Sequence, residues 1–246
     1  MRGFGRFLAV AAALLVAACA DDPNATAPNP AGTAQNDPYE STNRKVFEFD
    51  NKFDQALLLP TAKAYVAVVP EPARDGIHNF LLNLDIPITF ANDILQGDLT
   101  NAGQSFTRFA MNSTFGIGGL FDVASGAGIP PHEEDFGITL GKWGVGEGPY
   151  LVLPFLGPDP PRDATGQVVD IFLDPTTYIH LRDHFWYSAA RNGMEILDLR
   201  SRNIGTLEGL ERESIDYYAS VRSLYRQRRN NAINNGRPDV TNLPDL

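Results

Sequence analysis

Two uncharged apolar segments constrain most strongly what this chain can fold into. Glycine interrupts one of them, and glycine and proline interrupt the other. Residues 109–121 read FAMNSTFGIGGLF and residues 148–158 read GPYLVLPFLGP. Each is shorter than the roughly 20 residues that a helix needs to cross a bilayer. A backbone segment that glycine or proline interrupts cannot face hydrocarbon unless its N–H and C=O groups are paired or line a protected cavity. The segments therefore predict either ordinary core or a surface that contacts lipid beside a passage through the protein.

Apolar residues recur at steps of three and four in several other regions, as they do on one face of a helix. The clearest pattern predicts a single helix from Leu207 to Arg228, and a similar one predicts a helix from Phe185 to about Arg200. Four further helices are predicted, at 43–54, 72–84, 87–95 and 100–112. Since no run alternates as a strand would, we expect an all-α fold with long irregular stretches from Gly116 to Pro161.

Three glycines follow the helix predicted at 100–112, namely Gly116, Gly118 and Gly119. Glycine adopts positive φ at little steric cost, so we expect these residues to turn the chain back in a hairpin-like loop. Beside a lipid passage, such a loop would be a natural gate. The pattern does not indicate a nucleotide-binding loop, because no strand precedes it and no Lys-Ser or Lys-Thr pair follows it.

Cys19 is the only cysteine of the chain and closes an apolar leader that carries Arg2 and Arg6. This layout is typical of a secretory signal, and a lone cysteine excludes an internal disulfide. The leader resembles a bacterial lipobox, in which residues 1–18 are removed and Cys19 receives the acyl chains. The alternative is an ordinary signal peptide cut near Ala18. A transmembrane anchor is disfavoured because the apolar run is too short.

Composition divides the rest of the chain into three parts. Residues 19–37, rich in Pro, Ala, Asn and Thr, read as a lipidated flexible tether, 38–235 as a single helical domain, and 236–246 as a short disordered tail. The net charge of −10 would become −12 after loss of Arg2 and Arg6. This charge argues against a nucleic-acid partner and against binding to anionic lipid by bulk charge, so any affinity for membranes must be apolar.

Groups that would support enzyme activity are sparse. His180 and His184 are four residues apart, but no glutamate lies between them as in a zinc-protease helix. The run His132-Glu133-Glu134-Asp135 could hold a hard cation weakly, although an exposed charged turn is the commoner explanation. No G-x-S-x-G elbow supports a serine lipase. We therefore expect no enzyme activity, no metal and no cofactor, and a phospholipase ranks only third among the functional alternatives.

Many short motifs in one colinear order resemble the MlaA/VacJ family of outer-membrane lipoproteins. They are Asp37-Pro38-Tyr39-Glu40, Asn43-Arg44, Phe47-x-Phe49, Val69-Pro70-Glu71-Pro72-Ala73-Arg74, Asn79-Phe80, Asn83-Leu84, Leu95-Gln96-Gly97-Asp98, Phe106-Thr107-Arg108-Phe109, Asn112, Gly116, Gly118-Gly119, Asp122, Phe136-Gly137, Thr139-Leu140-Gly141, Trp143-Gly144-Val145-Gly146, Gly148-Pro149-Tyr150, Leu153-Pro154-Phe155 and Arg162-Asp163. The similarity covers most of the folded region and weakens after about Phe172.

The resemblance implies a ring-like assembly of amphipathic helices embedded in one membrane leaflet, with a central channel. It implies removal of misplaced phospholipid from the outer leaflet of a Gram-negative outer membrane and delivery to a soluble periplasmic lipid carrier, which maintains lipid asymmetry. It further implies association with a trimeric porin and a lipid-anchored location on the periplasmic side. The alternative function is a structural or porin-binding envelope lipoprotein that transports no lipid.

The site residues that follow from the motifs and apolar segments fall into two sets. The predicted lipidation site is Cys19. The predicted residues of the channel or lipid path are Asn43, Arg44, Phe47, Phe49, Arg108, Asn112, Phe115, Gly116, Gly118, Gly119, Leu120, Tyr150 and Pro154. Asn79, Asn83, Asn92 and Gln96 are further polar candidates for a headgroup passage. For each polar residue, the competing interpretation is a helix cap or a satisfied bond from side chain to backbone.

Overall fold

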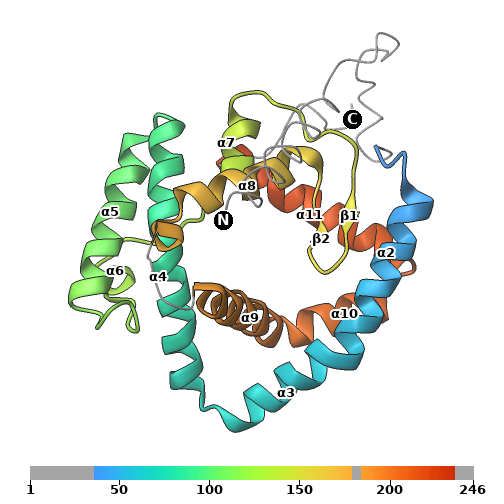
Figure 1. Ribbon diagram of the computed structural model, residues 1–246, viewed down its shortest axis with the longest axis horizontal. Coiled ribbons are helices and arrows are strands. Elements are labelled where there is room, and N and C mark those ends of the chain that lie inside the picture. Colours follow the sequence, from blue (N-terminus) through green and yellow to red (C-terminus); the bar gives the residue numbers. More distant parts are fainter. Residues whose placement is uncertain (1–35, 179–183, 236–246) are drawn as a thin grey trace, which may run out of the picture.

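The computed structural model describes residues 36–178 and 184–235, and most of this part of the chain is helical (Figure 1). In chain order its elements are α2 (Glu40–Phe53), η2 (Asp54–Leu58), α3 (Leu59–Val68), α4 (Glu71–Leu95), α5 (Leu99–Thr114), α6 (Val123–Gly126), α7 (Phe136–Lys142), β1 (Val152–Leu153), β2 (Gly157–Pro158), α8 (Pro161–Leu173), η3 (Pro175–Tyr178), α9 (His184–Arg202), α10 (Ile204–Glu213) and α11 (Tyr217–Ile233). The prediction of an all-α fold is confirmed. Cys19, the leader, His180 and the tail at 236–246 lie outside the described residues.

A short π-helix, η2, joins α2 to α3 without a break, so that residues 40–68 form one helical rod. Pro60 has no N–H group to donate to the carbonyl of Ala56, which weakens the ordinary α-helical pattern at this point. The N–H of Leu59 bonds instead to the carbonyl of Asp54, five residues earlier. The wider turn places the Asp54 carboxylate against Arg200 of α9, with N–O distances of 2.6 and 2.8 Å.

Helix α4 is continuous through Pro87, so the two helices predicted at 72–84 and 87–95 are one. Proline inside a helix removes a hydrogen bond and costs about 3 kcal/mol. Here α5 packs antiparallel to α4, while α8 and α9 also contact it. These contacts hold both halves of α4 in one line. The prediction of a break was wrong because it considered local backbone preference and not packing.

The single helix predicted at 207–228 is two helices, α10 and α11. Helix α10 ends at Glu213, and the backbone of the next residue, Ser214, is extended, with ψ 135°. Helix α11 then begins because the side chain of Asp216 accepts a hydrogen bond from the N–H of Ala219 at 3.1 Å. The apolar periodicity continues across this short interruption, and the sequence pattern could not reveal it.

The stretch predicted as irregular between Gly116 and Pro161 contains short elements. Asp122 and Asp135 cap α6 and α7, each accepting a bond from a backbone N–H three residues later. Strands β1 and β2 form an antiparallel hairpin in which Val152 lies opposite Pro158. Each of these elements is too short for a periodic pattern, so the expectation of fully irregular backbone was wrong for them.

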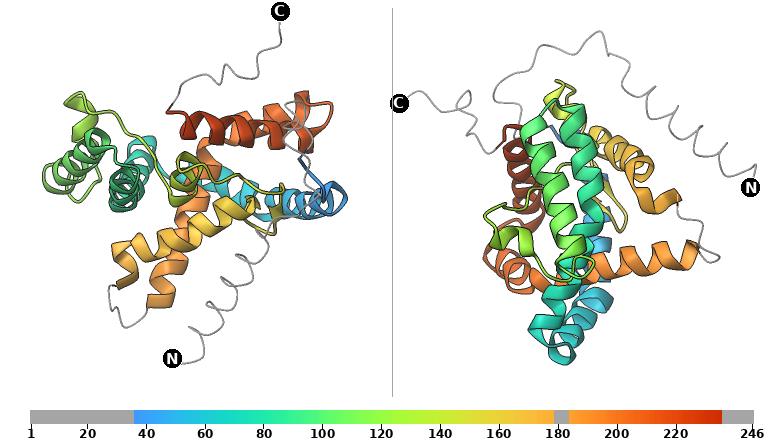
Figure 2. Two further views of the ribbon diagram at one scale, coloured as in Figure 1. Left: turned by 90° about the horizontal axis from the view of Figure 1, so that it is seen from above. Right: turned by 90° about the vertical axis from the view of Figure 1, so that its left-hand side faces the viewer.

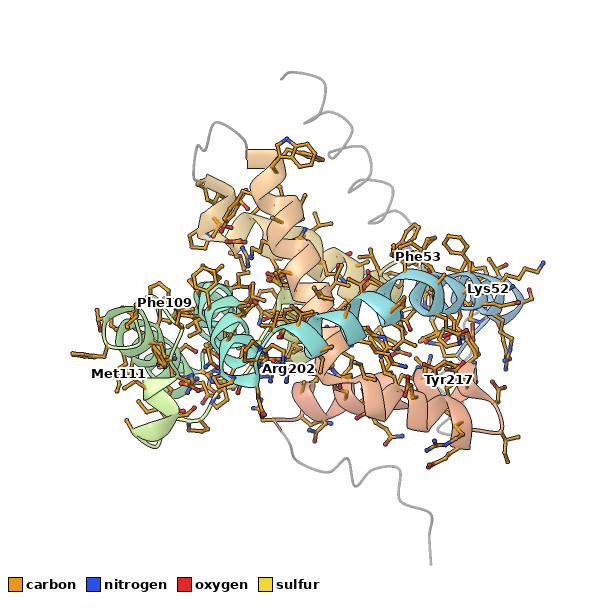
Figure 3. All side chains as sticks on the ribbon, turned by 90° about the horizontal axis from the view of Figure 1, so that it is seen from below. Lys52, Phe53, Phe109, Met111, Arg202 and Tyr217 are labelled. Atoms are coloured by element: carbon orange, nitrogen blue, oxygen red, sulfur yellow. The ribbon has the colours of Figure 1, made fainter. Side chains whose placement is uncertain are left out.

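The long helices are arranged around the outline of the molecule. In Figure 1, α2, α3 and α4 follow one another from the right-hand side through the bottom to the left, and α5 packs outside α4. Seen at right angles, α11 lies on one side of the layer formed by α2 to α5, and α8 with the beginning of α9 protrudes on the other (Figures 2 and 3). Among the described residues, no helix has both the length and the apolar character to cross a membrane.

Candidate functional site

The interior of the described structure is dominated by polar side chains. Its buried apolar residues number nine, whereas seventeen buried residues are polar or charged. The buried polar residues are Asp37, Asn43, Asn83, Thr89, Asn92, Asp93, Ser105, Arg108, Asn112, Thr139, Asp159, Arg162, Asp163, Asp198, Arg200, Ser201 and Arg226. Buried polar groups are costly unless they are hydrogen-bonded, and most of these are paired with one another. The helices are therefore joined mainly by directional polar contacts.

The exterior carries the large apolar side chains that the interior lacks. Twenty-seven large apolar residues of the described part are exposed, among them Phe106, Phe115, Phe121, Phe185 and Trp186. One of them, Phe109 of α5, lies toward the end of the molecule away from α2 (Figure 3). Soluble monomers rarely expose contiguous apolar patches larger than a few hundred Å². An apolar exterior of this extent suits contact with lipid.

One group of predicted site residues lies where α2 meets the β1–β2 hairpin and α11. The Asn43 amide donates to Asp37 Oδ1 at 2.8 Å and to the Tyr150 carbonyl at 2.9 Å, and its oxygen accepts from the N–H of Val152. Arg44 forms a two-pronged ion pair with Asp216 at 2.6 and 3.0 Å. These residues are buried or half-buried by their partners, so the structure supports the interpretation as satisfied packing for Asn43 and Arg44.

Aromatic contacts complete this group. The ring of Phe47 packs edge-on against Tyr217 and Tyr218 at 5.2 and 5.5 Å. Burial raises the pKa of the Tyr150 hydroxyl, and the nearby Asp37 carboxylate raises it to a smaller extent. Together with Asn43 and Arg44, these rings attach α2 firmly to α11 and to the base of the hairpin.

The tip of the hairpin rests on the exposed face of α2. Pro154 begins the turn, and Phe155 has a positive φ of 66°. The N–H of Phe155 donates to Asp50 Oδ1 at 2.9 Å, and its ring packs edge-on against Phe49 and Phe53 at 5.4 and 5.0 Å. The tip is thus held by one hydrogen bond and two partly exposed rings.

The glycine-rich loop after α5 does turn back on itself, as the sequence predicts. Gly118 and Gly119 have φ of 69° and 97°, and the N–H of Phe121 closes the loop on the Gly116 carbonyl at 3.0 Å. Gly116 is needed for a different reason, since a Cβ there would lie 2.2 Å from the Phe121 carbonyl oxygen. Phe115, at the start of the loop, and Leu120, within it, are exposed.

A buried ion pair fixes the end of this loop. Arg108 binds both carboxylate oxygens of Asp122 at 3.0 Å, and Asn112 donates to the same carboxylate at 3.1 Å. Burial alone would raise the pKa of Asp122, but the bonds from Ser125, Arg108 and Asn112 outweigh it and lower the pKa to about 2. Asp122 therefore stays ionised at neutral pH.

The structure does not bring the thirteen predicted channel residues into one site. Those from α2 and the hairpin lie on one side of the molecule, and those from α5 and its loop lie on the other (Figure 1). Of the further polar candidates, Asn79 and Asn83 line a cavity described next. Asn92 is buried against Asp170 and Thr139, while Gln96 donates to Glu134 and Thr139.

A cavity of about 360 Å³ lies between α4, α5, α8 and residues 131–135. We call it the acidic cavity because its lining includes six carboxylates, from Asp85, Asp122, Glu133, Glu134, Asp135 and Asp170. The other lining residues are Asn79, Leu82, Asn83, Ile86, Ile88, Thr89, Arg108, Asn112, Pro131 and His132. Arg108 and Asn112 are the predicted channel residues found here.

Comparison with known proteins identifies the fold and the family. The family model described as MlaA lipoprotein matches residues 35–232, which include the hairpin, the glycine-rich loop and the acidic cavity. The chain belongs to the MlaA lipoprotein family. The resemblance inferred from the motifs is thereby confirmed.

Named relatives of this MlaA-family chain come from several bacteria. "Intermembrane phospholipid transport system lipoprotein MlaA" of Escherichia coli (strain K12) is 37% identical over 209 residues, covering 82% of this chain and 80% of the relative. The Haemophilus influenzae protein of the same name is 33% identical, covering 86% of this chain and 85% of the relative. A solved structure described as "Structural basis for maintenance of bacterial outer membrane lipid asymmetry" matches with a TM-score of 0.73 and 38% identity, covering 80% of this chain and 98% of that one.

Sequence reasoning missed some residues of the acidic cavity in this MlaA-family fold, notably Asp85 and Asp170. Each lies within a largely apolar helical stretch, LLNLDIPI or VVDIFL. Carboxylates in such surroundings are uncommon, because burial of an unpaired charge is costly. That signal could have identified both residues, although not that they share one cavity.

A buried group of Ser105, His132 and Asp93 resembles the components of a hydrolase triad, but its geometry differs. Ser105 Oγ donates to Asp93 at 2.7 Å, and both Ser105 and Asp93 contact the same ring nitrogen, His132 Nε2, at 3.0–3.2 Å. A triad needs the histidine to bridge serine and aspartate through its two different nitrogens. Ser105 is also fully buried. This group holds α4, α5 and residue 132 together and provides no nucleophile.

The charged turn at 132–135 is tied to its neighbours and not simply exposed. Glu134 pairs with Lys142 at 2.8 Å, and Asp135 caps α7 and pairs with Arg229 at 2.5 Å. In the part of the chain that the structure describes, no group of three or more His, Cys, Asp or Glu is arranged to hold a metal ion. The ion pairs account for the Glu134 and Asp135 carboxylates within a charged turn.

Proposed function

We propose that this MlaA-family protein is an outer-membrane lipoprotein that removes misplaced phospholipid from the outer leaflet and passes it to a soluble periplasmic carrier. The observation that carries the proposal is the polar interior combined with an apolar exterior. Such a body suits one leaflet, because helices too short or too polar to cross a bilayer satisfy their polar groups internally and offer apolar side chains to lipid. Relatives bearing the name of a phospholipid transport lipoprotein support transport over a purely structural role.

The two sides of the layer suggest how the protein lies. Phe185 and Trp186, near the start of α9, are exposed and pack edge-on at 5.2 Å. Aromatic side chains favour the boundary between lipid and water. Helix α11, on the opposite side, is polar and rich in arginine. We expect the α8–α9 side to face the bilayer and the α10–α11 side to face the periplasm and the carrier.

Further parts of the proposal come from the family resemblance. They are a ring-like body with a central channel and association with a trimeric porin. Acylation at Cys19 follows from the lipobox-like leader, and the role of the loop at Gly116 to Gly119 as a gate follows from its glycines. The exposed Phe115 and Leu120 would place that loop in contact with lipid. No nucleotide-binding motif supplies energy here, so lipid would move passively and its direction would be set by the receiver.

Deletion of the gene tests the proposed transport. We expect more phospholipid in the outer leaflet, measured as acylation of lipid by a surface enzyme, and restoration by the full-length gene. The Cys19→Ala chain should lose both palmitate labelling and membrane retention. Unchanged outer-leaflet phospholipid in a deletion strain without a second copy would refute transport. Persistent palmitate labelling of the Cys19→Ala chain would refute the assigned anchor and leave the transport question separate.

A further inference from the structure

Large apolar side chains lie exposed where α8 ends and α9 begins. Ile171, Phe172, Tyr178, Phe185 and Trp186 each have more than half of their surface exposed, and we call these five residues the aromatic tip. The end of α8 and the start of α9 protrude from the layer formed by α2 to α5, on the side away from α11 (Figures 2 and 3). An exposed apolar surface of this kind marks a place of contact with lipid or with another molecule.

The backbone at the end of α8 finds its hydrogen-bond donors within the chain. The last four carbonyls of a helix have no partner inside that helix. Here the Ile171 carbonyl accepts a bond from Thr177 Oγ1, and the Phe172 carbonyl accepts one from the Tyr178 hydroxyl, both at 2.7 Å. In water, solvent would supply these donors, whereas hydrocarbon supplies none. The end of α8 is therefore equipped for contact with hydrocarbon.

The ion pair beside the aromatic tip is turned toward the protein. Arg191 binds Asp174 at 2.6 Å, and the two side chains are 10% and 13% exposed. The same guanidinium donates to Thr176 Oγ1 at 2.8 Å, which fixes α9 against η3. At the end of α10, by contrast, the side chains of Arg212 and Glu213 are 77% and 76% exposed. Exposed charge is costly in hydrocarbon and harmless in water, so this contrast favours lipid around the tip and water around the end of α10.

Helix geometry gives the thickness of the apolar surface. Arg191 follows Phe185 by six residues, which is about 9 Å of helix at a rise of 1.5 Å per residue. One leaflet contributes about half of the roughly 30 Å of hydrocarbon in a bilayer. For a helix directed along the membrane normal, Phe185 and Trp186 therefore reach the acyl chains while the Arg191 ion pair stays about 9 Å nearer the surface.

We infer that the aromatic tip is the part of the described chain that enters the bilayer most deeply, with its side chains among the acyl chains of lipid. The inference rests on the proposed location in a membrane leaflet and adds to it the element that inserts and the order of depth, with the α10–α11 junction in water. A protein partner would bring hydrogen-bond donors of its own, so the internal donors to the Ile171 and Phe172 carbonyls favour acyl chains as the occupant.

Tryptophan fluorescence tests the depth of the tip. Trp143 and Trp186 are the two tryptophans of the chain, so Trp143→Phe leaves Trp186 as the single reporter. The full chain is placed in protein-free phosphatidylcholine vesicles, with or without lipids brominated near the middle of their acyl chains, because bromine quenches indole fluorescence on contact. We expect Trp186 to lose most of its emission. Unchanged emission from vesicle-bound protein would overturn the inference.

A matched reporter on the other side of the molecule provides the control. Ile215 is fully exposed at the α10–α11 junction, and Ile215→Trp in a chain with both natural tryptophans replaced by phenylalanine places the reporter there. The brominated lipids should leave its emission unchanged. Equal quenching of Ile215→Trp and of Trp186 would overturn the order of depth.

Cysteine labelling measures the same property in cells and needs no change at Trp143. Cys19 is the only natural cysteine, so Phe185→Cys and Ile215→Cys each add one thiol. In cells with a permeabilised outer membrane, a charged maleimide should label Ile215→Cys, and should label Phe185→Cys only after detergent is added. Equal labelling before detergent would overturn the inference, as would protection in cells combined with unquenched Trp186 in vesicles, which indicates a protein partner. Neither measurement reports lipid removal, so the deletion strain tests the proposed function independently.

Discussion

Replacement of Asp159 by asparagine offers the sharpest test of the polar interior. Asp159 lies directly after β2, is 2% exposed, and its Oδ1 has no hydrogen-bond partner within the described structure. Burial contributes most to raising the pKa of Asp159 from 3.8 to about 7, and the carboxylates of Asp163 and Asp135 raise it further. The nearby Arg229 lowers this pKa, but by less. Asparagine has nearly the shape of the protonated acid and never ionises.

The magnitude follows from the two pKa values. The folded chain holds its proton up to about pH 7, whereas the unfolded chain releases it near pH 4, so stability falls as the pH rises between these values. At about 1.4 kcal/mol per pH unit, the cost is about 2 kcal/mol at pH 5 and about 4 kcal/mol at pH 8. Asp159→Asn should therefore be more stable than the unmodified protein by amounts that grow in this way.

Urea unfolding in a nonionic detergent, followed by far-ultraviolet circular dichroism at several pH values, measures the free energy of unfolding of both proteins. Subtracting one from the other removes the contribution of the other titrating groups. A difference that stays constant from about pH 5 to pH 8 would show that Asp159 is ionised in the folded protein and that the reasoning is wrong.

Three further tests, one of them with a control substitution, address other features. Gly119→Ala should lower the free energy of unfolding by about 1–3 kcal/mol, because φ there is 97° and the new Cβ would clash with a neighbouring side chain. The control, Gly103→Ala, places its Cβ in open space within α5 and should raise the free energy of unfolding by up to about 1 kcal/mol. Thermal unfolding of the two variants measures this difference. Arg200→Met should lower the free energy of unfolding by about 3–5 kcal/mol in the same assay, because it leaves the Asp54 carboxylate unpaired. A decrease under about 1 kcal/mol would contradict a structural role for the Arg200–Asp54 ion pair. Asp50→Leu removes the acceptor of the Phe155 N–H, so the hydrogen-exchange rate of the Phe155 amide should rise about tenfold while the α4 amides keep their protection. An unchanged exchange rate at Phe155 would show that this hydrogen bond does not hold the hairpin against α2.

The sequence predicted helices well and their joints poorly. Periodicity located α5 and α9 to within a few residues, since each presents a regular apolar face. It divided α4 at Pro87 and fused α10 with α11. Both errors have one physical origin: a break depends on what lies alongside. Packing by α5 overrides the proline, and the Asp216 cap, tied to Arg44, imposes a break that the apolar pattern does not register.

Prediction of the candidate site succeeded where the residue type itself constrains the backbone. Gly118 and Gly119 could be assigned to a turn because few other residues tolerate positive φ. Asp85 and Asp170 could not be assigned to a common cavity, because they are distant in sequence and come together only through the packing of α8 on α4. Asn43, a predicted channel residue, lies at the junction of α2 with the hairpin and bonds to the backbone of both Tyr150 and Val152.

The polar interior has a consequence for how such a sequence can diverge. In water, the hydrophobic effect selects which side chains turn inward, and core positions are the ones that evolution preserves. If the exterior lies in lipid, an apolar side chain gains little by burial, and directional bonds must specify the fold. The outer positions would then exchange freely among Leu, Ile, Phe and Val, while Asn43, Asp163 and Arg108 would tolerate almost nothing. Substitutions would then be tolerated among apolar residues at the surface and excluded at polar positions in the interior, whereas a water-soluble helical bundle tolerates polar substitutions at its surface and preserves an apolar interior.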